Sequence, residues 1–309
     1  MHNARRQVQV CVPATTANLG PGFDILGLAL QLYNHFSVQL TAEPDWHADL
    51  PPHVHLPANA NNLVFQAIQY LFNHVGFSCP GMQLSQTIDI PLARGLGSSS
   101  TAIVGGLVAA NCLSGANLSR AELLAMAIDL EGHPDNVTPA LMGGLTLSYM
   151  ADGQYRYLPL SFPEELVIVV AIPEFELSTA HARSVLPAQI SRADAIFNSS
   201  RTALLVYALQ ERRFDLLKTA MDDRLHQPYR AALVPGMLEA MHAAYDAQAL
   251  GVALSGAGPT LLAFVRGHPE AVATSLQDTF GQHGISCRTR VLSIDTHGAT
   301  IVPAQCTQQ

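Results

Sequence analysis

The stretch "PLARGLGSSSTA", residues 91–102, joins a glycine-rich turn to four consecutive hydroxyl residues, Ser98–Thr101. Apolar residues recur at helical spacing from Ala102 to Val108, which predicts that a helix begins near Ser98. The free N–H groups and the positive dipole end at the start of a helix attract anions. We therefore expect the helix start at Ser98–Ser100 to bind phosphate. The alternative is ordinary N-capping, which needs only one of the four hydroxyls.

Other glycine-rich and catalytic motifs do not fit this stretch. No lysine follows the glycine pair, so the P-loop pattern G-x-x-x-x-G-K-[ST] fails. Gly95 and Gly97 fit the dinucleotide pattern G-x-G-x-x-G, but Ser100 stands where the third glycine belongs. No G-x-S-x-G elbow is present, which weakens a serine hydrolase interpretation. Backbone amides, hydroxyls, a metal ion and Arg94 would share the role of the missing lysine.

A second polar cluster lies in "LEGHPDNVTPALMGG", residues 130–144, which brings Glu131, His133, Asp135 and Asn136 into six positions. A magnesium ion on phosphate prefers hard oxygen ligands and keeps several waters, so Glu131 and the Ser98 hydroxyl would suffice. The alternative is a polar loop after a helix, in which His133 is a hydrogen-bonded surface residue.

The composition excludes several classes of protein. Hydrophobic residues make up 49% and charged residues 13% of the 309 residues, as in a globular protein. The net charge of −8 argues against general binding of nucleic acid or anionic lipid. Lys218 is the only lysine, and we interpret it as a solvated residue of an amphipathic helix, so a Schiff-base mechanism is not expected.

Targeting and cysteine signals predict a cytoplasmic protein. The first residues have no apolar core of signal-peptide length, and the apolar run 166–172 is too short to span a bilayer. Cys11, Cys79, Cys112, Cys287 and Cys306 are widely spaced and include no C-x-x-C pair. They are expected to be reduced thiols, without a disulfide framework or a zinc site.

Hydrophobic periodicity predicts an α+β protein in two lobes, each with its own core, because strands and helices follow no regular βαβ order. The boundary is placed near residues 155–160. The expected strands are 8–12, 25–32, 143–150, 166–172, 261–265 and 287–294. The expected helices are 62–75, 119–131, 191–211, 212–223, 235–248 and one that starts at Pro269. Turns are expected at 13–24 and at Asp152-Gly153.

Three glycine-rich stretches in this order resemble the GHMP small-molecule kinases: residues 13–24, 91–101 and 255–260. The middle one is similar to the family motif P-x-x-x-G-L-G-S-S-[AS], and "SGAGPT" is similar to the C-terminal glycine motif. "VPATTANLGPGFDILGLAL" and "EGHPDNVTPALMGG" resemble the branch that acts on homoserine. The G-E-H element of galactokinases and mevalonate kinases is absent. The resemblance extends from about residue 8 to about residue 295.

The resemblance implies a two-lobed GHMP kinase fold. The N-terminal lobe, residues 1–157, would be like ribosomal protein S5 domain 2, and the C-terminal lobe, residues 158–309, would be ferredoxin-like. It also implies that ATP and Mg²⁺ phosphorylate the side-chain hydroxyl of L-homoserine to O-phospho-L-homoserine, in threonine biosynthesis. Such kinases are commonly dimers, so a homodimer is expected.

The resemblance also implies roles for individual residues. The nucleotide would be bound by Pro91, Leu92, Ala93, Arg94, Gly95, Leu96, Gly97, Ser98, Ser99, Ser100 and Thr101, with Asn62 and Val64 near the adenine. The ammonium would lie at Asn18 and Asp24, the carboxylate at Arg183 and Arg230, and the hydroxyl at Asn136 and His133. Ser98 and Glu131 would bind the metal, and the third motif is Ser255, Gly256, Ala257 and Gly258. The catalytic set is Asn136, Glu131, Ser98 and Asp24.

Asn62 and Val64 have a structural alternative, as a helix cap and a core residue. Phosphoryl transfer needs mainly positioning and charge stabilisation, so no strong general base is expected, and an Asp24 that holds the ammonium is badly placed to accept the hydroxyl proton. The alternatives are a GHMP kinase for another alcohol and a non-catalytic relative that senses a ligand.

Overall fold

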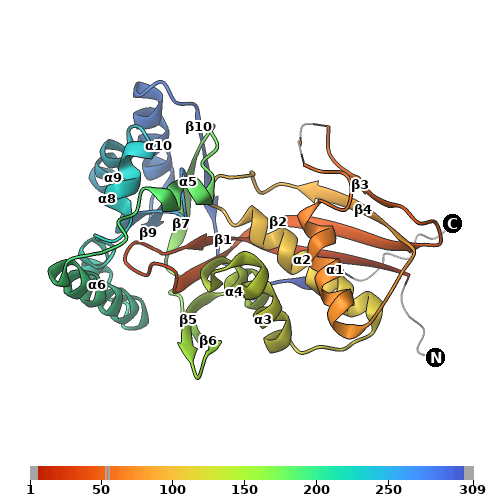
Figure 1. Ribbon diagram of the computed structural model, residues 1–309. Helices are drawn as coiled ribbons and strands as arrows, with labels where there is room; N and C mark the ends of the chain where they lie inside the picture. The colour runs from red at the N-terminus through yellow and green to blue at the C-terminus, as the bar shows by residue number, and fades with distance from the viewer. Residues whose placement is uncertain (1–5, 53, 55, 303–309) are drawn as a thin grey trace.

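The computed structural model describes residues 6–52, 54 and 56–302 (Figure 1). Its larger sheet has the strand order β11-β1-β2-β4-β3, and β5 pairs with β2 and with β6. All pairs are antiparallel except β3 with β4. The strands are β1 Gln7–Ala17, β2 Leu26–Thr41, β3 Trp46–Asp49, β4 Gly81–Ile88, β5 Leu145–Ala151, β6 Gln154–Leu160 and β11 Thr300–Val302.

Four helices cover one face of this sheet (Figure 1). They are α1 Leu63–Val75, α2 Ser98–Ser114, α3 Arg120–Glu131 and α4 Pro134–Met142. The expected boundaries of α1 and α3 are confirmed, because Asn62 and Ser119 cap them and Ser119 forms a capping box with Glu122. The helices enclose a core with the alternate apolar residues of β1, among them Val8, Val10 and Val12.

The second lobe has a four-stranded antiparallel sheet in the order β10-β7-β9-β8. Its strands are β7 Val167–Pro173, β8 Gly251–Leu254, β9 Leu261–Val265 and β10 Cys287–Leu292. Helices follow β7, and α10 lies between β9 and β10, which is the split βαβ order of a ferredoxin-like fold. The helices are α5 Thr179–Ser184, α6 Arg192–Gln210, α7 Leu217–Ala220, α8 Gln227–Arg230, α9 Met237–Asp246 and α10 Pro269–Gln282, with short 3-10 turns at Phe214–Leu216 and Ala231–Leu233. The predicted α+β class is confirmed.

The two lobes share a core, which the sequence analysis did not expect. One apolar cluster belongs to the first sheet and its helices, and another lies between the second sheet, α9 and α10. A third cluster joins Leu28 of β2 to Ile168 of β7 and Leu205 of α6. The predicted boundary at 157/158 falls within β6, and β11 returns to the first sheet. The division into 1–157 and 158–309 stays a prediction.

Two local predictions and one of the alternatives were wrong. Residues 13–17 continue β1 instead of turning, because their small side chains are buried and paired with β2 beyond a bulge at Pro13. Residues 134–142 form α4 instead of a loop, since Pro134 occupies the first helical turn, where its missing N–H costs nothing. The helix expected at 212–223 starts only at Phe214, because Arg212 has a positive φ of 55°, and it consists of a 3-10 turn followed by α7, which ends at Ala220.

Other predictions concern the cysteines, the lysine and the membrane. Cys11, Cys79, Cys112 and Cys287 are free thiols, and Cys306 lies outside the described residues. Lys218 is exposed, with its Nζ 4.7 Å from the ring centre of Tyr245. In the part of the chain that the structure describes, none of the helices has both the length and the apolar character to span a bilayer.

Candidate functional site

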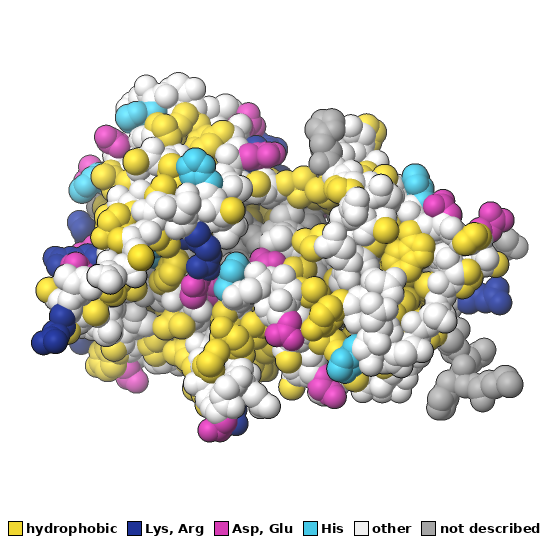
Figure 2. All heavy atoms as spheres, in the orientation of Figure 1, with side chains coloured by type: hydrophobic (Ala, Val, Ile, Leu, Met, Phe, Trp, Pro, Cys, Tyr) yellow, Lys and Arg dark blue, Asp and Glu magenta, His cyan; other side chains and the backbone are white. Residues whose placement is uncertain are grey.

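A cavity of about 440 Å³ lies where the two lobes meet. Figure 2 shows this region as a hollow with charged side chains of both signs at its edge. One end of the cavity is largely apolar, and the other end carries acids and arginines. The apolar end is lined by Phe36, Leu56, Pro57, Leu63 and Ile88. The charged end is lined by Asp24, Glu131, His133, Asp135, Arg183 and Arg230.

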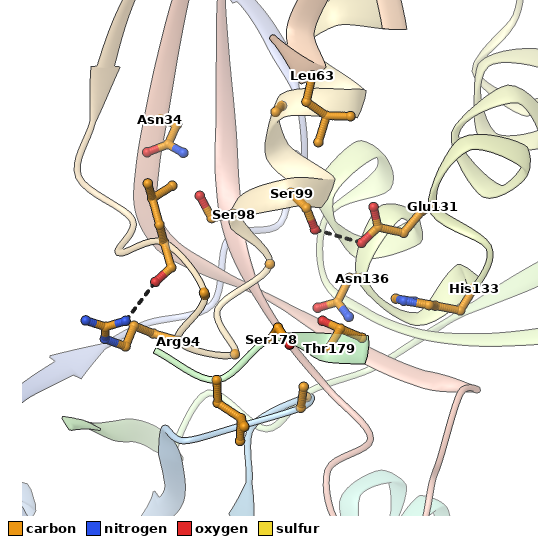
Figure 3. A pocket seen from close by; sticks show the side chains of 18 of the residues that line it. Asn34, Leu63, Arg94, Ser98, Ser99, Glu131, His133, Asn136, Ser178 and Thr179 are labelled. Atoms are coloured by element: carbon orange, nitrogen blue, oxygen red, sulfur yellow. Dashed lines mark hydrogen bonds between the residues drawn. The ribbon is translucent and has the colours of Figure 1, made fainter. Parts of the chain in front are cut away.

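The start of α2 lies between these two ends (Figure 3). Its N-cap is Gly97, with a φ of 71°, and no side chain caps the first turn. The alternative of ordinary serine capping is therefore wrong. The amides of Ser98–Ser100 precede the first helical bond, from Thr101 N to Gly97 O, so their N–H groups remain for a ligand.

Two glycines keep the backbone close to its neighbours at this point. A Cβ on Gly97 would lie 2.0 Å from Thr15 Oγ1, and one on Gly95 would lie 2.3 Å from the carbonyl oxygen of Ser255. Both glycines have positive φ, which other residues adopt only with strain. Ser255 Oγ in turn donates to Gly95 O at 2.6 Å, so the third motif supports the loop from behind.

The hydroxyl residues of α2 hold Glu131 instead of capping their own helix. Ser99 Oγ and Ser100 Oγ donate to Glu131 Oε1 at 2.8 and 2.9 Å, and Ser98 lines the cavity beside them (Figure 3). Thr101 Oγ1 donates to the carbonyl oxygen of Ser98. Neither Ser99 nor Ser100 was expected to touch the acid. Glu131 Oε2 takes neither of these serine hydrogen bonds.

The amide of Asn136 is oriented by a residue that the sequence analysis missed. Thr15 Oγ1 donates to Asn136 Oδ1 at 2.9 Å, which leaves the Nδ2 donor of Asn136 for the cavity. Beside it, His133 Nδ1 lies 2.9 Å from Asp135 Oδ1. Burial lowers the pKa of His133, but the hydrogen bond and charge of Asp135 outweigh it, so the pKa lies above its ordinary value.

The residues expected at the ammonium and at the carboxylate bind one another. Arg183 Nη2 and Nη1 donate to Asp24 Oδ1 and Oδ2 at 2.6 and 3.0 Å, in a bidentate pair. Asp24 has a φ of 61°, an uncommon conformation for aspartate. Asn18 accepts from the backbone N–H of Asp24 and donates to Gly256 O, so it links the first and third motifs.

Arg230 is 2% exposed and is held by the protein on one side. Its Nε donates to Ala182 O, and its Nη1 donates to Gly256 O and to His226 Nδ1. None of these bonds uses Nη2, and Arg230 lines the cavity. Burial lowers the pKa of Arg230 to about 10, and the charge of Arg183 adds to the effect.

His226, another missed residue, lies behind Arg230. Because an arginine only donates, His226 Nδ1 accepts, and Nε2–H donates to Gly20 O at 2.7 Å. The ring is fully buried and stacks on Phe23, with 5.2 Å between ring centres. The neutral Nε2–H tautomer therefore links the 18–25 turn to Arg230.

His226 should make the folded protein less stable in mild acid. Burial lowers the pKa of His226 against the opposing charge of Asp223, and Arg230 lowers it further. Below the ordinary value of 6.5, the unfolded chain takes up a proton that the folded state refuses. The contribution of neutral His226 to the free energy of unfolding is therefore fully present above that pH. It is lost as the pH decreases, by at most about 1.4 kcal/mol per pH unit.

Thermal unfolding at pH values above and below 6.5 would check this expectation. The slope of Tm against pH should be smaller in His226→Gln than in the wild type. It should be unchanged in His242→Gln, which alters an exposed histidine. Equal slopes in the wild type and His226→Gln would contradict the neutral buried ring.

Most of the predicted site residues do line the cavity. Those that line it are Asn18, Asp24, Asn62, Leu92, Ala93, Arg94, Gly95, Gly97, Ser98, Ser99, Glu131, His133, Asn136, Arg183, Arg230, Gly256 and Ala257. Those that do not are Pro91, Leu96, Ser100, Thr101, Val64, Ser255 and Gly258. Leu96 and Val64 are core residues, which confirms the structural alternative for Val64, and its neighbour Leu63 lines the cavity. Asn62 both caps α1 and lines the cavity.

Two family models match this sequence: GHMP kinases N terminal domain over residues 62–144 and GHMP kinases C terminal over residues 205–282. A homoserine kinase of Desulfitobacterium hafniense is 47% identical in an alignment of 302 residues, which covers 96% of this chain and 100% of that protein. One of Trichormus variabilis is also 47% identical, over 95% of this chain and 98% of that protein.

Solved structures agree with these sequence matches. The crystal structure of homoserine kinase from Cytophaga hutchinsonii has a TM-score of 0.89 at 28% identity and covers 98% of this chain and 99% of its own. The L. major mevalonate kinase structure in complex with R-mevalonate has a TM-score of 0.69 at 17% identity, over 90% of this chain and 94% of its own. The second likeness concerns the fold alone.

Proposed function

The chain belongs to the GHMP kinase family, and on that premise we propose that it transfers the terminal phosphoryl group of ATP to L-homoserine with the help of Mg²⁺. Its relatives at 47% identity over nearly the whole chain are homoserine kinases, so it is a kinase that acts on homoserine. The product is O-phospho-L-homoserine, and the reaction is a step in threonine biosynthesis. A homodimer in the cytoplasm stays a prediction.

One observation carries the assignment of the cavity. An uncapped helix start lies between an apolar end and an end that holds a carboxylate and two arginines. The apolar end suits a nucleobase, the amides suit phosphate, and the charged end suits an amino acid zwitterion. The three parts therefore lie in the order that nucleotide and acceptor require for direct transfer.

The side chains near Ser98 fit a magnesium ion bound to nucleotide phosphates. Within residues 6–52, 54 and 56–302, no group of three or more His, Cys, Asp or Glu side chains could hold a metal by itself. Mg²⁺ needs few protein ligands when phosphates and waters supply the others. We assign it to Glu131 and the Ser98 hydroxyl, where Ser99 and Ser100 orient the carboxylate. When bound, the ion offsets phosphate charge that a P-loop lysine would otherwise offset.

The acceptor would exchange partners with the Asp24–Arg183 pair. The ammonium of homoserine takes Asp24, with the remaining lone pair of Asn18 Oδ1, and its carboxylate takes Arg183 together with the preset Arg230. Each charge of the pair is thus replaced by a charge of the same sign on the substrate. This exchange favours a ligand that carries both charges.

Transfer then depends on position more than on a base. Asn136 Nδ2, oriented by Thr15, donates to the acceptor hydroxyl oxygen and holds it in line with the phosphoryl group. The amides of residues 95–100 and Arg94 offset charge on the phosphoryl oxygens. Asp24 is engaged by the ammonium, so the hydroxyl proton passes to an oxygen of the transferred phosphoryl group or to water.

An ADP-release assay with a panel of alcohols tests the proposed function. We expect ADP release that depends on L-homoserine, with kcat/KM at least about a hundredfold above that for mevalonate, galactose or shikimate. Preference for another alcohol would identify a different GHMP kinase. No turnover with any of them would indicate the non-catalytic ligand sensor.

A further inference from the structure

A single glutamine interrupts the apolar inner row of β4. Strand β4 alternates, so Met82, Leu84, Gln86 and Ile88 share the face toward the helices, while Gln83 and Ser85 are exposed on the other face. Gln86 is 6% exposed and stands opposite Phe36 of β2 in the strand register. Both residues line the apolar end of the cavity. The position therefore buries an amide where the pattern calls for a hydrocarbon side chain.

The Nε2 group of Gln86 has no hydrogen-bond partner in the part of the chain that the structure describes. Two other buried amides at this end, those of Asn34 and Asn62, each form hydrogen bonds through both the nitrogen and the oxygen. Asn34 donates to Thr101 Oγ1 and accepts from two backbone N–H groups. Asn62 donates to Pro57 O and accepts from the N–H of Val64. Among the buried amides that line this end in the described part of the chain, Gln86 is the one whose nitrogen makes no hydrogen bond, and an unpaired buried donor destabilises the fold unless a ligand binds it.

We propose that Gln86 recognises the nucleobase of the phosphoryl donor. The inference rests on the proposed function, because it needs a nucleotide whose phosphates lie at the start of α2. Figure 3 shows Asn34 and Leu63 on the other side of Ser98 from Arg94 and Asn136. A base beyond the phosphates therefore lies among Phe36, Leu63 and Ile88, against Gln86.

The chemistry of an amide favours adenine at this position. A glutamine donates with Nε2 and accepts with Oε1, and adenine offers the matching pair, an N7 acceptor beside the N6 amino donor. The same edge of guanine carries two acceptors, N7 and O6, which one amide cannot satisfy together. Gln86 is thus a specificity-determining residue for ATP over GTP.

The change Gln86→Met tests the proposal, because methionine keeps the length of the side chain and removes the amide. We expect the KM for ATP to rise about tenfold and the affinity for ADP, measured by calorimetry, to fall about tenfold. The ATP to GTP preference should fall by a similar factor. Both kcat and the KM for homoserine should stay near wild-type values. The nucleotide-free variant should unfold about 2 °C higher, since an unpaired buried donor is gone.

Gln83→Met is the matched control, a glutamine of the same strand that is exposed and donates to Asp49 Oδ2. It should leave nucleotide affinity unchanged. A second arm needs no variant: purine riboside diphosphate, which lacks the 6-amino group, should bind the wild type about tenfold more weakly than ADP. In Gln86→Met the difference between the two ligands should vanish.

Two results would overturn the proposal. Unchanged ADP affinity in Gln86→Met with a higher Tm would mean that the amide holds only water. Equal binding of ADP and the purine riboside analogue by the wild type would also exclude it, even if the variant failed to fold. The binding arms need no turnover, so they remain decisive if homoserine-dependent ADP release, and with it the proposed function, fails.

Discussion

Replacing Glu131 by glutamine is expected to lower kcat about a thousandfold, the largest effect of any single change in the cavity. Glutamine still accepts the hydrogen bonds of Ser99 and Ser100, so the fold and the position of the side chain are kept. Only the negative charge is lost. Since the binding of Mg²⁺ depends on that charge, the Mg²⁺ concentration for half-maximal activity should rise at the same time.

Steady-state kinetics over a series of Mg²⁺ concentrations measures both effects. Asp129→Asn is the control, because Asp129 is an exposed carboxylate of the same helix and accepts a hydrogen bond from Tyr70 Oη. It should behave like the wild type. A Glu131→Gln enzyme with wild-type kcat and wild-type magnesium dependence would refute the metal assignment.

The second large effect is expected from Asp24→Asn, which should raise the KM for homoserine about fiftyfold. The variant loses a charged acceptor for the ammonium and leaves Arg183 without its partner. If Asp24 binds the ammonium and is no base, kcat should change less than about fivefold. A collapse of kcat at unchanged KM would instead make Asp24 the general base.

An analogue without the amino group distinguishes binding of the ammonium by Asp24 from a role of Asp24 as general base. The wild type should use 4-hydroxybutyrate at least about fiftyfold less well than homoserine in kcat/KM. Asp24→Asn should discriminate much less between the two, because its side chain no longer attracts a cation. The KM for ATP serves as an internal control and should not change in the variant. If Asp24→Asn discriminated between homoserine and 4-hydroxybutyrate as strongly as the wild type does, the ammonium would bind elsewhere.

Local patterns predicted much of the fold, and their failures have physical causes. The capped helices α1 and α3 and the apolar strand β7 were predicted to within about two residues, because caps and periodicity act within one segment. Helix α4 was missed because its polar start looks like a loop, whereas Val137, Ala140 and Leu141 are buried in the core. The shared core was missed because it joins residues far apart in the chain.

Motifs alone determined which segments form the site and the order in which they occur. A glycine-rich loop before a helix and a carboxylate after another helix can be recognised without coordinates, since each is a local property of the chain, whereas Arg183 and Arg230 were singled out only by the family resemblance. Only the tertiary structure decided which groups are free to bind. Gly97 leaves the helix start uncapped, Asp24 and Arg183 occupy each other, and the amide of Gln86 is left unpaired. Whether a polar group is satisfied depends on partners that folding brings from distant segments, and no local pattern contains that information.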